Sequence, residues 1–224
     1  MNTTWHRNQV EPGRRRSAVA FTLIEMLLVI SIIGVLTAMI IGLSGYAAEK
    51  RIRSRVTAEL HMLLTAIDSY KAQFGTYPPD NQLPALVVDR SFPNQLYYEL
   101  SGTEVTTVGN VSTFTSLQHR EQLTSMQIPK VVGVTGFRNA SEDSKAIKSF
   151  LTKPPKIEHY STNGVQNFDV LVASAPGPND IVQGGTNKYN PWRYIVTNPT
   201  NNPTTFDLWA EVKIGKKTIL IGNW

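Results

Sequence analysis

The chain has 224 residues, no cysteine and a formal net charge of +5 at pH 7. A sequence without cysteine excludes a disulfide framework and thiolate metal sites. The first 20 residues contain four arginines and one glutamate, a net of +3, so the other 204 residues carry a net charge of only +2. That small surplus does not indicate nucleic-acid binding, and the length suffices for one modest globular domain besides the segments described next.

Residues 21–43 form an apolar run that begins Phe-Thr-Leu-Ile-Glu and contains one charged residue, Glu25. About 20 apolar residues in a helix cross a hydrocarbon core of about 30 Å, so the run predicts a transmembrane helix. A carboxylate in such a helix costs about 2.5–3.5 kcal/mol on insertion. We therefore expect Glu25 to reach the membrane interface or to have a cationic partner.

A basic segment precedes the apolar run, with Arg14–Arg16 followed by the small residues of positions 17–20. Positive charge is retained on the cytoplasmic side of a membrane. We therefore expect the residues before the run to be cytoplasmic and those after Leu43 to be exported across the inner membrane.

The junction of a small residue, Ala20, with Phe-Thr-Leu-Ile-Glu at residues 21–25 resembles the leader of type IV prepilins and type II secretion pseudopilins. The family usually has glycine where this chain has Ala20. The resemblance implies that a prepilin peptidase cleaves between Ala20 and Phe21 and methylates the new amino terminus of Phe21. It also implies that Glu25, one helical turn from that amine, pairs with the amine of a neighbouring subunit during filament assembly.

Two other interpretations of this region stay open. A glutamate near a helix N-terminus is also stabilised by the helix dipole, or by extending to the membrane interface. Residues 45–48, Gly-Tyr-Ala-Ala, are small enough for cleavage by a periplasmic signal peptidase. However, the apolar run is longer than the roughly 7 to 15 residues typical of a secretory signal.

Residues 44–75 predict an amphipathic continuation of the helix. Apolar residues recur at spacings of three and four, which places them on one face. Glu49 lies four residues before Arg53, a favourable spacing for an ion pair. Gly75, with two prolines beyond it, predicts that the helix ends near Phe74. The apolar stripe consists of Ile52, Val56, Leu60, Leu63, Ile67, Tyr70 and Phe74.

Residues 76–165 give a weaker pattern and are expected to form a variable αβ-loop or insertion region. The region opens with the Tyr-Pro turn of residues 76–81, which resembles the turn after the stem in major pseudopilins. We expect a short helix at Leu96–Leu100, a polar loop at Ser101–Ser116, and a helix from an N-cap at Ser141 to about Leu151.

Residues 166–224 predict a small antiparallel sheet that covers the apolar stripe of the helix. Pro, Gly and Asn residues separate the expected strands. Segments 190–194, 206–209 and 221–224 resemble the carboxyl-terminal part of major pseudopilins. The expected strands are Phe168–Ala173, Trp192–Thr197, Phe206–Val212 and Thr218–Ile221.

The connection between the last two strands is poor in metal ligands. Major pseudopilins commonly bind calcium in an acidic, Gly-rich loop there, whereas this chain has Lys216 and Lys217. Asp207 and Glu211 supply few oxygens for an ion that prefers six to eight, so we expect no calcium in this loop, with Asp180 as a weak alternative.

Catalytic and metal-binding motifs are not found in the sequence, so we expect a protein that is not an enzyme and binds no cofactor. The histidines lack metal-ligand spacing and are His6, His61, His119 and His159.

These patterns predict an α+β, pilin-like fold in which a long N-terminal α-helical stem, transmembrane and then amphipathic, packs on a small C-terminal antiparallel β-sheet. The expected segments are a leader at 1–20, the transmembrane stem at 21–43, the amphipathic stem at 44–75, the variable region at 76–165 and the sheet at 166–224.

The resemblance implies a structural subunit that is cleaved, N-methylated and polymerised into a pseudopilus for type II protein secretion. The implied partners are other pilin-like subunits, the prepilin peptidase, an inner-membrane assembly platform and membrane lipid, with no nucleic acid. The implied location is the bacterial inner membrane, with a single span, a cytoplasmic N-terminus, a periplasmic C-terminal domain, and assembly into a periplasmic or surface filament. The alternatives are a type IV pilin for adhesion, motility or DNA uptake, and, from another class, a membrane-anchored or secreted binding protein.

Overall fold

The computed structural model describes residues 22–84, 90–153, 155–178, 181–183 and 187–224, with the side chains of 40–45, 181–183 and 187–188 outside this description. The predicted leader at 1–20 and Phe21 therefore lie outside the described residues. The chain divides into two compact units, Met1–Ala47 and Ala48–Trp224. Helix α1, Leu23–Phe74, contributes residues to both units.

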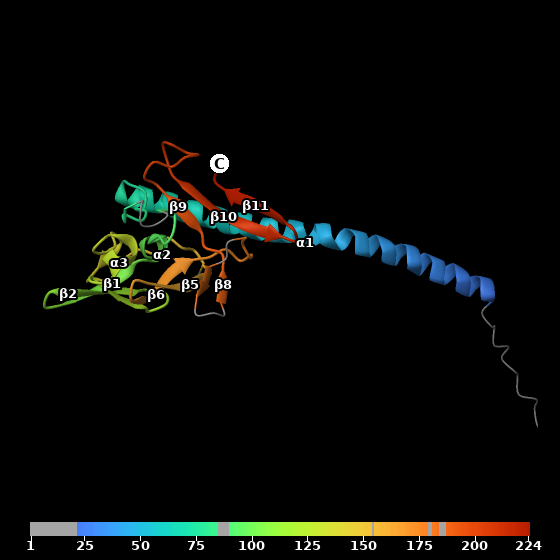
Figure 1. Cartoon of the computed structure of the whole chain (residues 1–224), viewed down its shortest axis with the longest axis horizontal. Coiled ribbons are helices and arrows are strands. Elements are labelled where there is room, and N and C mark those ends of the chain that lie inside the picture. Colours follow the sequence, from blue (N-terminus) through green and yellow to red (C-terminus); the bar gives the residue numbers. More distant parts are fainter. Residues whose placement is uncertain (1–21, 85–89, 154, 179–180, 184–186) are drawn as a thin grey trace, which may run out of the picture. The chain divides into compact units, whose positions relative to one another are not determined.

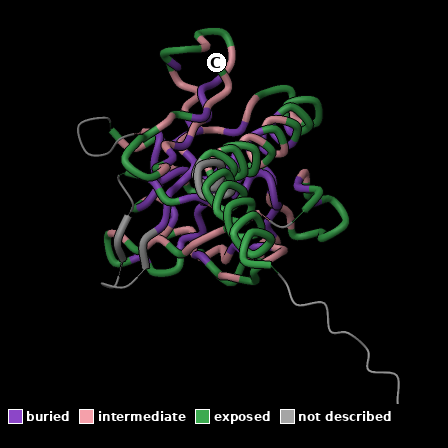
Figure 2. The backbone as a smooth tube through the Cα atoms, turned by 90° about the vertical axis from the view of Figure 1, so that its right-hand side faces the viewer, coloured by how far each residue is buried: buried purple, intermediate pink, exposed green. Residues whose placement is uncertain are grey.

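The described part of the first unit is the beginning of helix α1, where the large apolar side chains of residues 23–39 are exposed. Figure 2 shows this part of the helix in green, in contrast to the purple interior of the second unit. The Ser31 and Thr37 hydroxyls each donate to the carbonyl four residues earlier, at 2.8 Å and 2.7 Å. These two polar side chains are therefore satisfied by the helix itself.

No helix within the described residues has both the length and the apolar character needed to cross a membrane. Residue 21 and the side chains of 40–43, which belong to the predicted span at 21–43, are outside the description.

In the second unit, the predicted apolar stripe of α1 is buried. Ile52 and Phe74, at its two ends, are partly buried against the same core. The helix ends at Phe74, and Gly75 follows with a positive φ of 77° and donates its N–H to the Lys71 carbonyl at 2.7 Å. The amphipathic pattern and the helix end are confirmed. The buried stripe residues are Val56, Leu60, Leu63, Ile67 and Tyr70.

The remaining described elements are two short helices and eleven strands. The helices are α2, Leu96–Ser101, and α3, Ile128–Val132. The first strands are β1, Thr103–Val108, β2, Val111–Ser116, β3, Gln122–Thr124, β4, Ala140–Ser141, β5, Ile157–Thr162, and β6, Val165–Leu171. The last are β7, Ile181–Gln183, β8, Asn187–Tyr189, β9, Arg193–Ile195, β10, Asp207–Ile214, and β11, Lys217–Gly222.

An antiparallel sheet in the order β11-β10-β9 lies along α1 (Figure 1). Along β10, Leu208, Ala210 and Val212 are fully buried, while Trp209 and Glu211 between them are partly exposed. This alternation places one face of the sheet against the core that contains the α1 stripe. The expected sheet over the helix is confirmed, with three of the four predicted strands in it.

The fourth predicted strand, β6, pairs instead with β5 in a separate two-stranded sheet. The expected boundary between the segments 76–165 and 166–224 falls inside β6, after its first residue. A four-stranded sheet in the order β3-β2-β1-β4 and the β7–β8 pair complete the β-structure of the described residues.

Two predictions for the middle of the chain are wrong. Residues 101–116 are not a polar loop but the hairpin β1–β2, whose strands are rich in β-branched Thr and Val. Ser141 does not cap a helix, because its Oγ accepts the Asp143 N–H at 3.1 Å in a local turn after β4. The short helix expected at Leu96–Leu100 is confirmed as α2. The described residues thus form an α+β structure of helices and mainly antiparallel sheets.

Candidate functional site

Of the three predicted site residues, Glu25 is described, while Ala20 and Phe21 lie outside the described residues. Glu25 lies in the first turn of α1 and is exposed. Its Oε2 accepts the Thr22 backbone N–H and the Thr22 hydroxyl, each at 2.8 Å. The Glu25 N–H in turn donates to Thr22 Oγ1 at 3.3 Å.

This reciprocal arrangement is a capping box, in which a threonine and a glutamate three residues later satisfy two free N–H groups at a helix start. The sequence Thr22-Leu-Ile-Glu25 has the spacing of a capping box, so the sequence contains the signal for this role of Glu25, which was not among the predictions. Among the described residues, Glu25 forms no ion pair. The carboxylate therefore fixes the beginning of the helix.

The C-terminal end of α1 is fixed by Arg138. Its guanidinium donates to the Phe74 carbonyl through Nη2 at 2.9 Å and to Thr76 Oγ1 through Nη1 at 2.6 Å. A cation at the last carbonyls of a helix satisfies free acceptors and interacts favourably with the helix dipole. The end of the helix is thus attached to the segment before β4.

A buried carboxylate, Glu99, joins α1 to α2 and to the same segment. Tyr70 of α1 donates its hydroxyl to Glu99 Oε2 at 2.8 Å, and the backbone N–H groups of Arg138 and Asn139 donate to Glu99 at 2.9 Å and 3.1 Å. Burial raises the pKa of Glu99, and the three donors oppose that rise. This network is a structural support for the helix rather than a reactive centre.

The Tyr-Pro turn after the helix binds the edge of the three-stranded sheet. Tyr194 of β9 donates its hydroxyl to the Pro78 carbonyl at 2.7 Å. Asp80, which is fully buried, accepts the N–H groups of Val196 and Thr197 at 3.0 Å and 2.7 Å. These bonds hold the returning chain against the sheet.

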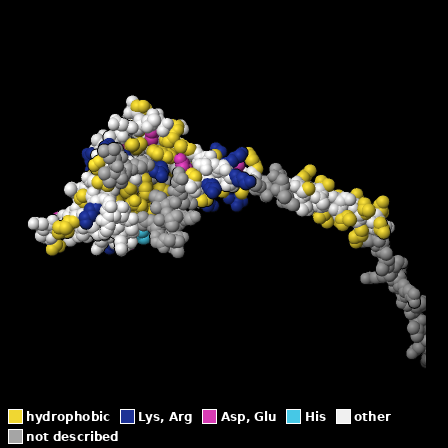
Figure 3. Space-filling view, viewed as in Figure 1, with side chains coloured by type: hydrophobic (Ala, Val, Ile, Leu, Met, Phe, Trp, Pro, Cys, Tyr) yellow, Lys and Arg dark blue, Asp and Glu magenta, His cyan; other side chains and the backbone are white. Residues whose placement is uncertain are grey.

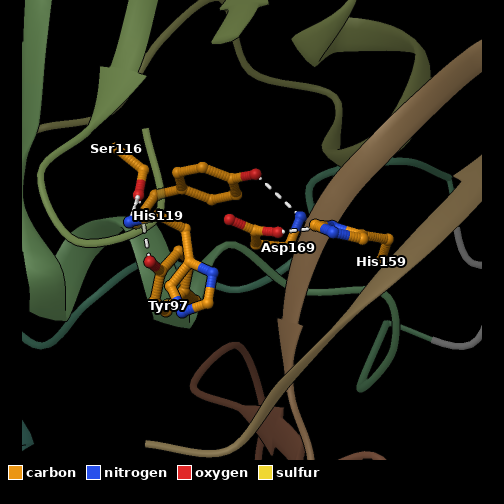
Figure 4. Close-up of polar contacts among 6 residues, drawn as sticks. Tyr97, Ser116, His119, His159 and Asp169 are labelled. Carbon is orange, nitrogen blue, oxygen red and sulfur yellow. Dashed lines mark hydrogen bonds and ion pairs between the residues drawn. The ribbon is translucent and has the colours of Figure 1, made fainter. Parts of the chain in front are cut away.

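Figure 4 shows a polar cluster that the sequence did not predict, built around Asp169 of β6. Asp169 is fully buried and faces His159 of β5 across the strand pair, with 2.8 Å between Asp169 Oδ1 and His159 Nδ1. Its backbone N–H donates to the Tyr98 hydroxyl at 2.7 Å, while Oδ2 is buried without a partner among the described residues. His119, from the connection between β2 and β3, lies beside the Tyr97 ring.

Burial raises the pKa of Asp169 to about 6, although the nearby His159 and His119 lower it in part. The cluster places an exposed imidazole of β5 over a buried carboxylate of β6. Sequence spacing could not reveal this pair, because it depends on the register of two strands.

The region expected to lack calcium is a tight hairpin. Ile214 pairs with Lys217, which leaves Gly215 and Lys216 as a two-residue turn between β10 and β11. The buried Asp207 carboxylate accepts the backbone N–H groups of Asn201 and Asn202 at 2.8 Å and 2.9 Å. Within the described part of the chain, no group of three or more acidic or histidine side chains is placed to hold a metal ion.

Asp180, the weak alternative for a calcium ligand, lies outside the described residues. The expectation that calcium is not bound stays a prediction.

This chain is similar to a curated protein, the type II secretion system core protein G of Klebsiella michiganensis, to which it is 34% identical over 86 residues. The match covers 38% of this chain and 61% of the relative, so the chain spans about three fifths of the length of the relative. A comparison with models of known protein families finds no match, and none is found among solved structures. The resemblance to pseudopilins that residues 21–25 indicated is confirmed by this relative.

Proposed function

We propose that this chain is a pseudopilin, a structural subunit that is cleaved before Phe21, methylated there, and assembled into a pseudopilus for type II protein secretion. The observation that carries the proposal is the position of Glu25, exposed in the first turn of α1 within the motif Phe-Thr-Leu-Ile-Glu. The similarity to a type II secretion core protein G favours a pseudopilus over an adhesive or motile pilus. In this role the protein is a building block and not an enzyme.

In this proposal Glu25 has two roles, to cap the helix and to pair with an amine, and these roles can be tested separately. The Thr22 donors stabilise the helix start and offset part of the cost of a carboxylate in an apolar helix. They leave its charge uncompensated, and an uncompensated charge in a medium of low dielectric constant attracts a cation strongly. Cleavage before Phe21 creates such a cation, the terminal amine, one helical turn from Glu25 on the same chain and equally on each neighbouring subunit.

The same proposal places residues 21–43 in the inner membrane, with the second unit on the periplasmic side before assembly. The exposed apolar side chains of residues 23–39 suit a lipid or helix-packed environment. The Ser31 and Thr37 hydroxyls, which bond to their own helix, would not need water there. Other pilin-like subunits, a prepilin peptidase and an assembly platform are the partners that this function requires.

Three variants distinguish the charge of Glu25 from its capping role. Glu25→Gln keeps a side chain that can complete a capping box but removes the charge. Thr22→Val removes the hydroxyl bonds but keeps the charge, and Glu25→Ala removes both. Each full-length variant is expressed with a prepilin peptidase and the secretion assembly proteins, and filaments are counted by electron microscopy against membrane-bound subunit.

We expect Glu25→Gln and Glu25→Ala to remain in the membrane and to lose filaments, whereas Thr22→Val forms them. Normal filament yield from Glu25→Gln would show that the carboxylate acts only as a helix cap and would contradict the proposed pairing with the amine.

A further inference from the structure

The first two turns of α1 in the second unit carry four exposed cations within six residues: Lys50, Arg51, Arg53 and Arg55. We call this set the basic collar. Figure 3 shows Lys and Arg side chains gathered on this stretch of the helix. The only acidic residue between positions 46 and 58 is Glu49, which contacts Arg53 at 3.8 Å with both side chains partly exposed to solvent. The collar therefore keeps a net charge of about +3 after that weak pair is counted.

The cations surround the helix instead of forming one face. At 3.6 residues per turn, Arg51, Arg55 and Arg53 lie about 100°, 140° and 300° around the axis from Lys50. The gap between about 140° and 300° is the side of Ile52 and Val56, which face the protein core. Lys50 and Arg51 thus lie away from the core, while Arg55 and Arg53 flank the core-facing side and each line a hollow with other residues of the second unit.

We infer that the basic collar binds the anionic phosphate headgroups of the bilayer leaflet at which the C-terminal end of the apolar run lies. This inference rests on the membrane anchoring stated under the proposed function. A ring of charge fits a surface that surrounds the helix, because a protein partner would contact one face only. Polybasic segments beside a membrane helix attract anionic lipid in this way.

The order of residues along the helix agrees with a headgroup location. Lys50 follows the end of the apolar run at Leu43 by seven residues, about 10 Å of helix. The headgroup layer is about 5–8 Å deep on each side of the hydrocarbon core, so the collar, which extends from about 10 Å to about 18 Å of helix beyond the run, begins just outside this layer. Side chains on a helix lean toward its N-terminus, so these long cationic side chains extend back toward the membrane. Tyr46, whose side chain is exposed, lies between the run and the collar, where aromatic residues are enriched at membrane interfaces.

The test uses the full chain in nanodiscs that contain spin-labelled phosphatidylglycerol or spin-labelled phosphatidylcholine. Electron paramagnetic resonance measures the fraction of each lipid immobilised by the protein. The test variant is R51Q/R53Q/R55Q. The control is K145Q/K213Q/K217Q, which removes the same charge from exposed positions elsewhere in the second unit. Circular dichroism checks that both variants keep the helix content of the unmodified protein.

We expect the unmodified protein and the control variant to prefer phosphatidylglycerol by at least about fivefold, the effect of roughly one cation near an anionic surface. The preference should fall to about one in R51Q/R53Q/R55Q, and in all proteins at 1 M salt, because salt screens the attraction.

Equal selectivity in the test and control variants would overturn the inference, as would a protein without any preference at low salt. If R51Q/R53Q/R55Q loses filaments but no lipid selectivity exists, the collar binds an acidic protein surface instead. A chain that immobilises neither lipid is not anchored in the membrane, and that result contradicts the proposed function rather than the collar alone.

Discussion

Replacing Asp169 with asparagine should remove a loss of stability that the second unit undergoes as the pH rises from about 4 to 6. Asp169 is fully buried, and its pKa rises from 3.8 to about 6 in the folded protein. Between these values the folded state binds more protons than the unfolded state, so the free energy of unfolding falls as the pH increases. A difference of about two pKa units corresponds to a total loss of about 3 kcal/mol, which is complete only near pH 7 because half of the Asp169 carboxyl groups are still protonated at pH 6.

The asparagine side chain of the variant has nearly the same shape as aspartate and carries no charge, so the variant should lack this dependence. At pH 4 the free energies of unfolding of the two proteins should be similar. By pH 7 the variant should have gained about 3 kcal/mol relative to the unmodified protein, about 2–4 °C in Tm for each kcal/mol in a domain of this size. The groups that face Asp169 are His159 on β5, and His119 and Glu121 near β3.

The assay is urea denaturation of the full chain in a nonionic detergent, followed by tryptophan fluorescence at pH 4, 5, 6 and 7. Asp68→Asn, on the exposed side of α1, is the control and should change the free energy by no more than about 0.5 kcal/mol at any pH. The reasoning is refuted if the difference between Asp169→Asn and the unmodified protein is constant across these four pH values.

Two further substitutions test the packing of the stem on the second unit. Tyr70→Phe removes the hydroxyl that donates to Glu99 and should lower the free energy of unfolding by about 1.5–3 kcal/mol in the same urea titration, whereas an unchanged midpoint would mean that this bond adds nothing. Leu63→Ala opens a cavity where α1 meets Trp192 and should lower the free energy of unfolding by about 2–5 kcal/mol, measured by thermal unfolding. The control, Thr65→Ala at an exposed position, should lower it by about 0.5 kcal/mol or less. Equal losses of stability in the two variants would show that Leu63 is not part of the core.

The stem and the sheet over it were predictable because each carries a strong periodic signal. The stripe of α1 repeats every three to four residues, and Gly75 supplies the positive φ with which a helix commonly ends. In β10, alternation of Leu208, Ala210 and Val212 with partly exposed residues is the pattern of a half-buried strand. In both cases, burial against one partner surface determines the pattern.

The β1–β2 hairpin was missed although its signal is present. Its strands are joined by the two residues Gly109-Asn110, and Gly109 has a φ of +61°, as tight hairpin turns require. The many Ser and Thr residues suggested a polar loop, but Thr is also a strand former because it is β-branched. Composition alone therefore favours a loop, whereas the turn chemistry of Gly109-Asn110 indicates a hairpin.

The expected helix after Ser141 fails for a tertiary reason. Asn139 accepts the Lys148 N–H through its side chain at 3.3 Å and donates to the Lys148 carbonyl at 2.6 Å. These bonds take the backbone groups that a helix would use, and they depend on the position of Asn139 beside Glu99. Local sequence contains no information on that position.

The candidate site also contains one feature that the local sequence predicts and one that depends on tertiary structure. The capping box of Thr22 and Glu25 is a local pattern that the sequence contains in full. The pair of His159 and Asp169 depends on the register of β5 with β6, so no spacing in the sequence identifies it.

The proposed function is tested most directly by the mass of the mature amino terminus. The full chain is expressed with a prepilin peptidase, recovered from membranes and analysed by intact-mass and peptide mass spectrometry. We predict a chain that begins at Phe21 and carries one methyl group on its amine. A chain that retains the arginines of residues 14–16, or one that begins near Glu49, would contradict the proposal that Glu25 pairs with an amine created by cleavage.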